Sequence, residues 1–188
     1  MKAIALTGSI GSGKTTVLKF VRSFRIATVD SDAIVRKLYR EKRVQEKLRQ
    51  VFGTANRKKI ASIVFSSPSK RRKLEKILHP LVWRRVKSRL SSFRKQGKLI
   101  AFVDVPLLFE ANWQKRFDFV VFVKASKEKC IKRLQKKGFG KREALVRWQA
   151  QLSPRKKIKS SDYIIDNGHS LAKTRKQVKQ LLSKLGAR

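Results

Sequence analysis

The stretch GSIGSGKT at residues 8–15 decides the fold class. It matches the pattern G-x-x-x-x-G-K-[ST], in which a glycine-rich loop holds the phosphates of a nucleoside triphosphate. Residues 2–7 before it are typical of a buried strand, and residues 14–24 after it predict a helix with one apolar face. Because such loops lie between a strand and a helix, we predict a nucleotide site here.

The residue types of this loop suit a triphosphate and a metal ion. Its glycines let the backbone adopt positive φ angles close to a phosphate, and consecutive N–H groups at the start of the helix attract the anion. Lys14 is expected to reach the β- and γ-phosphates, and the Thr15 hydroxyl is expected to ligate Mg²⁺. A nucleoside triphosphate, ATP or GTP, and Mg²⁺ are therefore the expected cofactors. The expected ATP-binding residues are Gly11, Ser12, Gly13, Lys14, Thr15 and Thr16.

Length and composition favour one compact α/β unit with insertions, because the chain has 188 residues and 41% of them are hydrophobic. Cys130 is the only cysteine, which rules out an internal disulfide and fits a reducing cytosol. No stretch is long and apolar enough to span a membrane. We therefore expect a cytoplasmic monomer with no membrane partner.

The charge balance is unusual, because 49 Lys and Arg stand against 12 Asp and Glu, a net charge of +37. Such basicity suggests contact with nucleic acid, yet the basic residues are spread over nearly every expected helix and are not gathered in one arm. We expect non-specific, salt-dependent binding to polyanions. An unusual cellular milieu, a nucleic-acid role and a recharged surface stay open as its origin. Several acids stand at strand ends or in motif-like strings: Asp30, Asp32, Asp104, Glu110, Asp118, Asp162 and Asp166.

Five apolar segments predict strands that alternate with helices. The expected strands cover residues 2–7, 26–29, 98–104, 118–124 and 162–166. The third has no polar alternation, as expected for a strand that is covered on both faces. This alternation of strands and helices predicts an α/β fold with a doubly wound, parallel, five-stranded sheet.

Residues 31–96, between the second and third expected strands, are too long for one crossover helix and predict a helical substrate-binding insertion. Within it, Asn56 is the expected N-cap of a helix that reaches about residue 65. Pro80 falls inside a helical pattern, so we expect a helix break at His79 and a new helix from Pro80 onward.

Two further helical stretches are expected, one after the fourth strand and one after the fifth. Residues 126–160 are strongly basic and are interrupted by Gly138 and Gly140, which are candidate hinges. Residues 136–156 form a candidate helical lid whose cations neutralise the transferring phosphoryl group, and the alternative is a solvated basic face. The tail at 170–185 is expected to be a helix with these residues facing inward: Leu171, Val178, Leu181 and Leu185.

Carboxylates after two of the expected strands are candidates for chemistry. Asp30 and Asp32 follow the second strand, where such sheets bind ligands, and a carboxylate there is a candidate base for an acceptor hydroxyl. The alternative is that Ser31 or Asp32 only caps a helix at residues 33–39. Asp104 ends the third strand and is a candidate for holding Mg²⁺ through water, the alternative being a turn residue before Pro106. Two histidines and one cysteine give no support for a zinc site.

Five longer strings occur together in one known family in this order and spacing. They are IALTGSIGSGKTTV at 4–17, TVDSDAIVRKL at 28–38, LEKILHPLV at 74–82, VDVPLLFEA at 103–111 and DYIIDNGHS at 162–170. Through them, over roughly residues 3–180, the chain resembles the dephospho-coenzyme A kinase family of P-loop kinases.

This resemblance implies ATP-dependent phosphorylation of the ribose 3′-hydroxyl of dephospho-CoA, giving CoA and ADP in the last step of coenzyme A synthesis. It implies a nucleotide-binding core at 1–30 and 97–188, a CoA-binding insertion at 31–96 and a lid at 136–156. Asp32 resembles the family's base for the hydroxyl, and Lys14 would bind the phosphates. The residues implied for the substrate are Asp32, Arg36, His79, Leu107, Leu108 and Glu110, and those implied for the lid are Lys137, Arg142 and Arg147.

The sequence departs from the family pattern at Lys137, where the family commonly has arginine. Lysine cannot make the same two-pronged contact with phosphate, so Arg133, Arg142 or Arg147 is the alternative lid cation.

Two rival functions stay open on the sequence. One is another P-loop metabolite kinase, such as a nucleoside-monophosphate kinase, and the other is a basic nucleic-acid-binding protein with a secondary nucleotide site. The dispersed basic residues, and the lack of a nucleic-acid-binding signature, favour the kinase.

Overall fold

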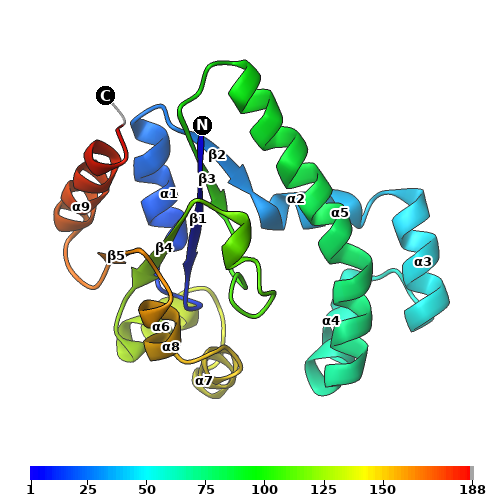
Figure 1. Ribbon diagram of the computed structural model, residues 1–188. Coiled ribbons are helices and arrows are strands. Elements are labelled where there is room, and N and C mark those ends of the chain that lie inside the picture. The colour runs from blue at the N-terminus through cyan, green and yellow to red at the C-terminus, as the bar shows by residue number, and fades with distance from the viewer. Residues whose placement is uncertain (187–188) are drawn as a thin grey trace. The chain divides into compact units, whose positions relative to one another are not determined.

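A five-stranded sheet organises the fold in the computed structural model, which describes residues 1–186 (Figure 1). The strands are β1 (Lys2–Gly8), β2 (Ala27–Asp30), β3 (Ile100–Asp104), β4 (Phe119–Lys124) and β5 (Tyr163–Asp166), in the order β2-β3-β1-β4-β5. The central strand β1 runs parallel to β3 and β4, and β4 runs parallel to β5. The predicted doubly wound, five-stranded parallel sheet is confirmed.

The chain divides into two units, which we describe separately. The core unit contains Met1–Val29 and the chain from Ser92 onward, and the helical unit is Asp30–Ser91. The sheet and the phosphate loop lie in the core unit.

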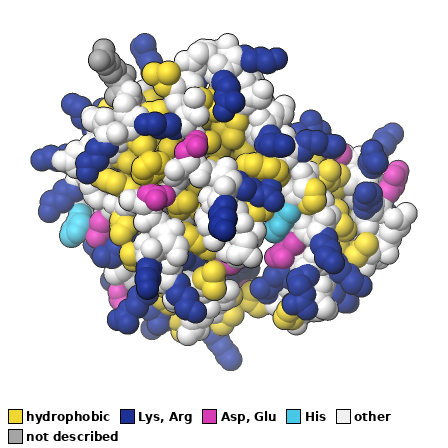
Figure 2. All heavy atoms as spheres, in the orientation of Figure 1, with side chains coloured by type: hydrophobic (Ala, Val, Ile, Leu, Met, Phe, Trp, Pro, Cys, Tyr) yellow, Lys and Arg dark blue, Asp and Glu magenta, His cyan; other side chains and the backbone are white. Residues whose placement is uncertain are grey.

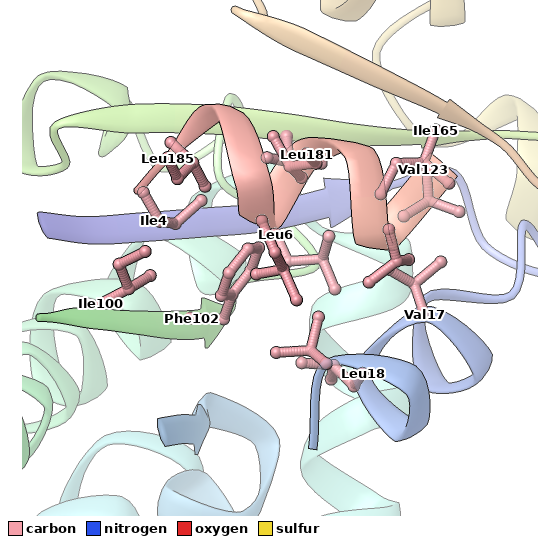
Figure 3. Packing of buried hydrophobic residues seen from close by; sticks show 14 residues of the cluster. Ile4, Leu6, Val17, Leu18, Ile100, Phe102, Val123, Ile165, Leu181 and Leu185 are labelled. Atoms are coloured by element: carbon pink, nitrogen blue, oxygen red, sulfur yellow. The ribbon is translucent and has the colours of Figure 1, made fainter. Parts of the chain in front are cut away.

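In the core unit, α1 (Lys14–Ser23) and α9 (Leu171–Lys184) lie side by side on one face of the sheet (Figure 1). Figure 3 shows side chains of α9 turned toward β1, and side chains of α1 completing the cluster beside β3. Burying these apolar side chains stabilises the unit, and it anchors the loop between β1 and α1 at both ends. The cluster consists of Ile4, Leu6, Val17, Leu18, Val21, Ile100, Phe102, Val121, Val123, Ile165, Val178, Leu181, Leu182 and Leu185.

Two aspartates extend the hydrogen bonding at the amino ends of the strands. The Asp118 carboxylate accepts a hydrogen bond from the Ala3 N–H at 2.7 Å, and the Asp162 carboxylate accepts one from the Val120 N–H at 2.7 Å. Each therefore satisfies a backbone donor of a neighbouring strand.

The basic stretch after β4 forms three helices, α6 (Lys127–Gln135), α7 (Lys141–Gln149) and α8 (Pro154–Lys159). The predicted interruption at the two glycines is confirmed, because Gly138 lies between α6 and α7 with φ of +92° and Gly140 is the N-cap of α7. A second break follows α7, since Ser153 caps α8 and Pro154 is its first residue. A short 3₁₀ helix, η1 (Gln114–Arg116), precedes β4.

The tail helix α9 corrects one expected inward residue. Val178, Leu181 and Leu185 are buried as predicted, but Leu171 is 63% exposed. It is the first residue of the helix, directly after the N-cap Ser170, and the buried position at this end is taken by Thr174.

The helical unit contains α2 (Ser31–Leu38), α3 (Lys42–Phe52), α4 (Arg57–Ser66) and most of α5 (Pro68–Lys95). The predicted N-cap at Asn56 is confirmed, because its side chain accepts hydrogen bonds from the N–H groups of Lys58 and Lys59 at 3.0 and 3.2 Å. Arg85 of α5 pairs with Glu41, the N-cap of α3, at 2.9 Å.

The predicted helix break at His79 is wrong, because α5 continues through Pro80. Proline removes one backbone hydrogen bond and crowds the preceding turn. Pro80 is exposed, so the carbonyl that loses its partner can be hydrated on the solvent side. Buried residues before and after it, Leu78, Val82 and Val86, keep both halves of the helix packed on one face.

Candidate functional site

The phosphate loop leaves β1 at Gly8 and enters α1 at Lys14. Gly11 and Gly13 adopt φ angles of +78° and +95°, a region that favours glycine. Gly13 is the N-cap of α1, and within residues 1–186 no side chain caps this helix. The start of α1 is therefore the positive end of a helix dipole, which attracts an anion.

The glycines also allow a close approach that no side chain would permit. A Cβ on Gly11 would lie 2.5 Å from the Cys130 carbonyl oxygen of α6, and a Cβ on Gly13 would overlap the Asn167 side-chain amide. Neighbouring elements therefore press against the outside of the loop and fix its shape.

Two residues far away in the sequence hold the loop from outside. Arg133 of α6 donates hydrogen bonds to the carbonyl oxygens of Ser12 at 2.7 Å and Gly11 at 3.3 Å. Asn167, which is buried directly after β5, donates to the same Ser12 oxygen at 2.8 Å and accepts from the Thr174 hydroxyl at 3.0 Å. These donors therefore fix the carbonyl groups of Gly11 and Ser12 from outside the loop.

The sequence patterns do not single out Asn167 as a site residue, and they indicate Arg133 only as an alternative lid cation. Arg133 also donates to the Asn167 carbonyl at 2.8 Å, so its guanidinium braces the loop. The one sequence signal for Asn167 is a polar residue directly after an apolar strand, within the string DYIIDNGHS.

Lys14 and Thr15 are the first two residues of α1, directly after the loop glycines. The Lys14 ammonium donates to the carbonyl oxygens of Gly8 at 2.9 Å and Ser9 at 3.4 Å, which holds it over the loop. Thr15 is exposed at the start of α1, so its hydroxyl is accessible.

Asp104 is half-buried at the end of β3, in register with Leu6 of the central strand. Its carboxylate and the loop therefore both lie at the carboxyl edge of adjacent strands. A hydroxyl and a carboxylate are oxygen ligands that suit Mg²⁺, which usually keeps several waters and binds substrate phosphates. No group of three His, Cys, Asp or Glu side chains that could hold a metal occurs within the described residues. The residues present thus fit a water-rich Mg²⁺ site.

The segment after β3 holds three of the residues implied for the substrate. Leu107 is 48% exposed, whereas Leu108 has no exposed surface and packs in the core. The Glu110 carboxylate accepts a hydrogen bond from the Leu152 N–H at 3.1 Å and pairs with the Lys157 ammonium at 2.7 Å. Leu107 therefore offers surface to a ligand, while Leu108 and Glu110 support the segment.

The cations implied for a lid are spread over α6, the turn after it and α7: Arg133 lies on α6, Lys137 follows the C-cap of α6, and Arg142 and Arg147 lie on α7. Lys137 and Arg142 are exposed. Arg147 pairs with Glu143 at 2.9 Å, and its guanidinium lies 4.8 Å from the centre of the Phe139 ring.

Three predicted residues belong to the helical unit: Asp32, Arg36 and His79. The cap of α2 is Asp30 and not Ser31 or Asp32, because the Asp30 carboxylate accepts from the Ala33 N–H at 2.8 Å. Asp30 also lies 3.5 Å from the exposed Arg36 guanidinium. Asp32 is left exposed in the first turn of α2, free of the capping role.

The single cysteine lies beside the loop. Cys130 is buried in α6, and burial raises the pKa of its thiol, against the smaller lowering effect of Arg133 and Lys14. Burial therefore disfavours the reactive thiolate form of Cys130.

Figure 2 shows Lys and Arg side chains over all visible parts of the surface, with few Asp and Glu between them. Within residues 1–186, none of the helices combines the length and apolar composition that crossing a membrane requires.

The sheet order, with a glycine loop between the central strand and α1, defines a P-loop nucleotide-binding protein. A sequence model of dephospho-CoA kinase matches residues 2–173. The chain belongs to the dephospho-CoA kinase family.

Individual relatives agree with this family. The chain is 35% identical to the dephospho-CoA kinase of Listeria innocua, covering 94% of both chains, and 38% identical to that of Bartonella henselae, covering 95% of both. A crystal structure from Thermus thermophilus is 31% identical and has a TM-score of 0.87, covering 98% of this chain and 97% of that one. A shikimate kinase from Bacteroides thetaiotaomicron, 16% identical with a TM-score of 0.57 and coverage of 98% of both chains, shares the fold alone.

Proposed function

We propose that this protein transfers the γ-phosphoryl group of ATP to the ribose 3′-hydroxyl of dephospho-CoA, giving CoA and ADP. The observation that carries the proposal is the phosphate loop, whose left-handed Gly11 and Gly13 lead into a helix start that no described side chain caps. Membership of the dephospho-CoA kinase family supports the choice of acceptor.

The loop residues have distinct roles in this reaction. The N–H groups from Gly11 to Thr16 bind the phosphates, and Lys14 exchanges its contacts with the loop carbonyls for the β- and γ-phosphates. Thr15 and, through water, Asp104 would hold Mg²⁺, which when bound neutralises charge on the phosphates. The chain's own contribution is mainly positioning and electrostatic stabilisation.

Asp32 is the proposed base that accepts or orients the proton of the acceptor hydroxyl. Two observations support it: Asp30 has taken over the capping of α2, and the Asp32 carboxylate is exposed. Since α2 starts at the residue after β2, Asp32 is two residues from the end of that strand. Arg36 and His79 would bind the acceptor from the same helical unit.

Residues 31–96 are proposed to bind the CoA part of the acceptor. In the core unit, the exposed Leu107 is a further apolar residue proposed to contact the acceptor. Residues 136–156 are the proposed lid, with Lys137, Arg142 and Arg147 as its cations. The glycine at 138, with its left-handed φ angle, favours a hinge at the start of this stretch. At its other end, Gln151 bonds to the Ile10 N–H of the phosphate loop and the Leu152 N–H bonds to Glu110. Within the proposed lid, the part that moves would therefore end before residue 151.

The cellular compartment, the oligomeric state and the binding of polyanions form part of the same proposal. A single buried, reduced cysteine suits the cytoplasm, and we propose a monomer there. The net charge of +37 supports non-specific, salt-dependent binding to polyanions, with no further substrate implied.

The direct test is a coupled assay of ADP release with ATP and a panel of acceptors. Dephospho-CoA should be consumed, whereas AMP, CMP and shikimate should give no ADP above background. Consumption of AMP or CMP in place of dephospho-CoA would overturn the proposed acceptor.

The base is tested separately with Asp32→Asn. Loss of a general base lowers kcat by roughly 10²- to 10⁴-fold, while the melting temperature should stay unchanged because the side chain is exposed. Glu128→Gln, at an exposed acid on α6 and outside the proposed acceptor-binding and lid segments, is the matched control and should keep full activity. Equal rates for the two variants would remove Asp32 from this role.

A further inference from the structure

A short segment that follows α7 and runs into α8 contacts both the phosphate loop and the chain after β3. It covers residues 151–157, QLSPRKK, and we call it the linking segment. It starts two residues after α7 ends and includes the first turn of α8. All the contacts described below lie inside the core unit.

The first contact joins the linking segment to the phosphate loop. The Gln151 side-chain oxygen accepts a hydrogen bond from the Ile10 N–H at 2.8 Å. Ile10 is the third residue of the loop, just before the left-handed Gly11. Since Arg133 and Asn167 hold only the carbonyls of Gly11 and Ser12, Gln151 fixes the loop at a different point.

The second contact joins the linking segment to Glu110. The next residue in the chain, Leu152, donates its N–H to Glu110 at 3.1 Å, and the same carboxylate oxygen lies 2.7 Å from the Lys157 ammonium. The Lys157 side chain has no exposed surface, and that of Glu110 is 22% exposed. An ammonium group buried to this degree requires a nearby carboxylate, because an unpaired buried charge is strongly unfavourable.

The geometry of one contact therefore depends on the other. Lys157 holds Glu110, Glu110 holds the Leu152 backbone, and Leu152 adjoins Gln151. Glu110 and the Ile10 N–H are thus held by two consecutive residues of the chain.

We propose that Gln151 is a positioning residue for the phosphate loop and that the Glu110–Lys157 pair keeps it in place. The loop that binds ATP and the segment after β3 then adopt their working geometry together. This inference rests on the proposed kinase function for its effect on turnover, but its effect on nucleotide affinity does not need the acceptor.

The first experiment compares Gln151→Met with Gln180→Met. Methionine keeps the length of glutamine but has no oxygen to accept from Ile10, and Gln180 is an exposed residue on α9. With a fluorescent, non-hydrolysable ATP analogue as the probe, Gln151→Met should raise Kd roughly 2- to 10-fold, the effect of one hydrogen bond. KM for ATP should rise with it and kcat should fall, while the melting temperature should match that of Gln180→Met.

The second experiment tests the dependence on the ion pair. In the Glu110→Gln/Lys157→Met variant no charge is buried alone, so it should fold even if Lys157→Met does not. It should bind the analogue more weakly than the wild-type protein does. Adding Gln151→Met to it should weaken binding by less than Gln151→Met does alone, because Gln151 has already lost its support.

Each result decides the inference. Unchanged analogue affinity in Gln151→Met would overturn the role of Gln151, and strictly additive effects in the triple variant would overturn its dependence on the pair. Wild-type protein that binds the analogue but does not phosphorylate dephospho-CoA would contradict the proposed function and leave this test intact.

Discussion

Replacing Gly13 by alanine tests how tightly the phosphate loop is packed from outside. Two penalties are expected. At the φ angle of +95° that Gly13 adopts, an alanine has a backbone strain of about 1–2 kcal/mol, because its Cβ is crowded in the left-handed region. Its Cβ also overlaps the Asn167 amide, which must move away from Ser12 and Thr174. Losing those two hydrogen bonds costs about 0.5–1.5 kcal/mol each.

Gly97→Ala is the matched control. Gly97 has φ of +72° in the same unit, and nothing lies within 4 Å of an added Cβ. This variant therefore has the backbone strain without the clash. Gly13→Ala should be less stable than Gly97→Ala by about 1–3 kcal/mol in urea unfolding followed by circular dichroism. For a chain of this size, that lowers the melting temperature by about 2–4 °C for each kcal/mol.

The clash itself is isolated by removing Asn167. In the Asn167→Ala background the added Cβ no longer meets the amide, so Gly13→Ala should cost only about the strain of 1–2 kcal/mol. Equal stabilities of Gly13→Ala and Gly97→Ala would refute the reasoning. So would full additivity of Gly13→Ala and Asn167→Ala.

Three further outcomes follow from the site and the surface. Lys14→Ala should lower kcat by roughly 10²- to 10³-fold with the circular dichroism spectrum unchanged, and residual activity near wild type would contradict its role. Burial raises the pKa of Cys130, so iodoacetamide should alkylate the native thiol far more slowly than the unfolded one at pH 8.5. For the same reason, the free energy of unfolding should fall as pH rises through about 8.5, because the thiol of the unfolded chain loses its proton before that of the folded protein does. Affinity for heparin should fall steeply with salt, and a salt-independent affinity would argue for a specific polyanion site.

The sheet and the phosphate loop could be predicted from sequence because their signals are local. Apolar runs of four to seven residues mark the strands, and the glycine pattern lies between one strand and one helix. Asn56 is a similar case, since an N-cap acts on the next few residues.

The errors arise where distant packing outweighs a local rule. Pro80 should end a helix, but its exposure and the buried residues on either side let α5 continue. Leu171 fits the apolar pattern of α9 but lies at its first turn, beyond the buried face. The cap of α2 moved by one residue, to Asp30, within the ±1–2 residues by which helix ends vary.

The contacts that hold the loop could not be predicted, because each joins residues more than 120 positions apart. Arg133 to Ser12, Asn167 to Ser12 and Gln151 to Ile10 depend on how α6, β5 and the linking segment meet the loop. A basic residue such as Arg133 also carries no distinguishing signal in a chain with 49 lysines and arginines.

The few acids show why so large a positive charge is compatible with the fold. Asp30 caps α2, Asp118 and Asp162 each bind a backbone N–H of a neighbouring strand, and Asp166 accepts from the Gly168 N–H at 2.7 Å. Glu110 pairs with the one fully buried ammonium among the described residues. The acids with such backbone or buried partners are fixed by the fold, whereas most of the lysines and arginines are exposed and have no comparable structural requirement. Neutralising exposed lysines should therefore change polyanion binding while leaving stability nearly the same, and replacing Asp118 or Asp162 should do the reverse.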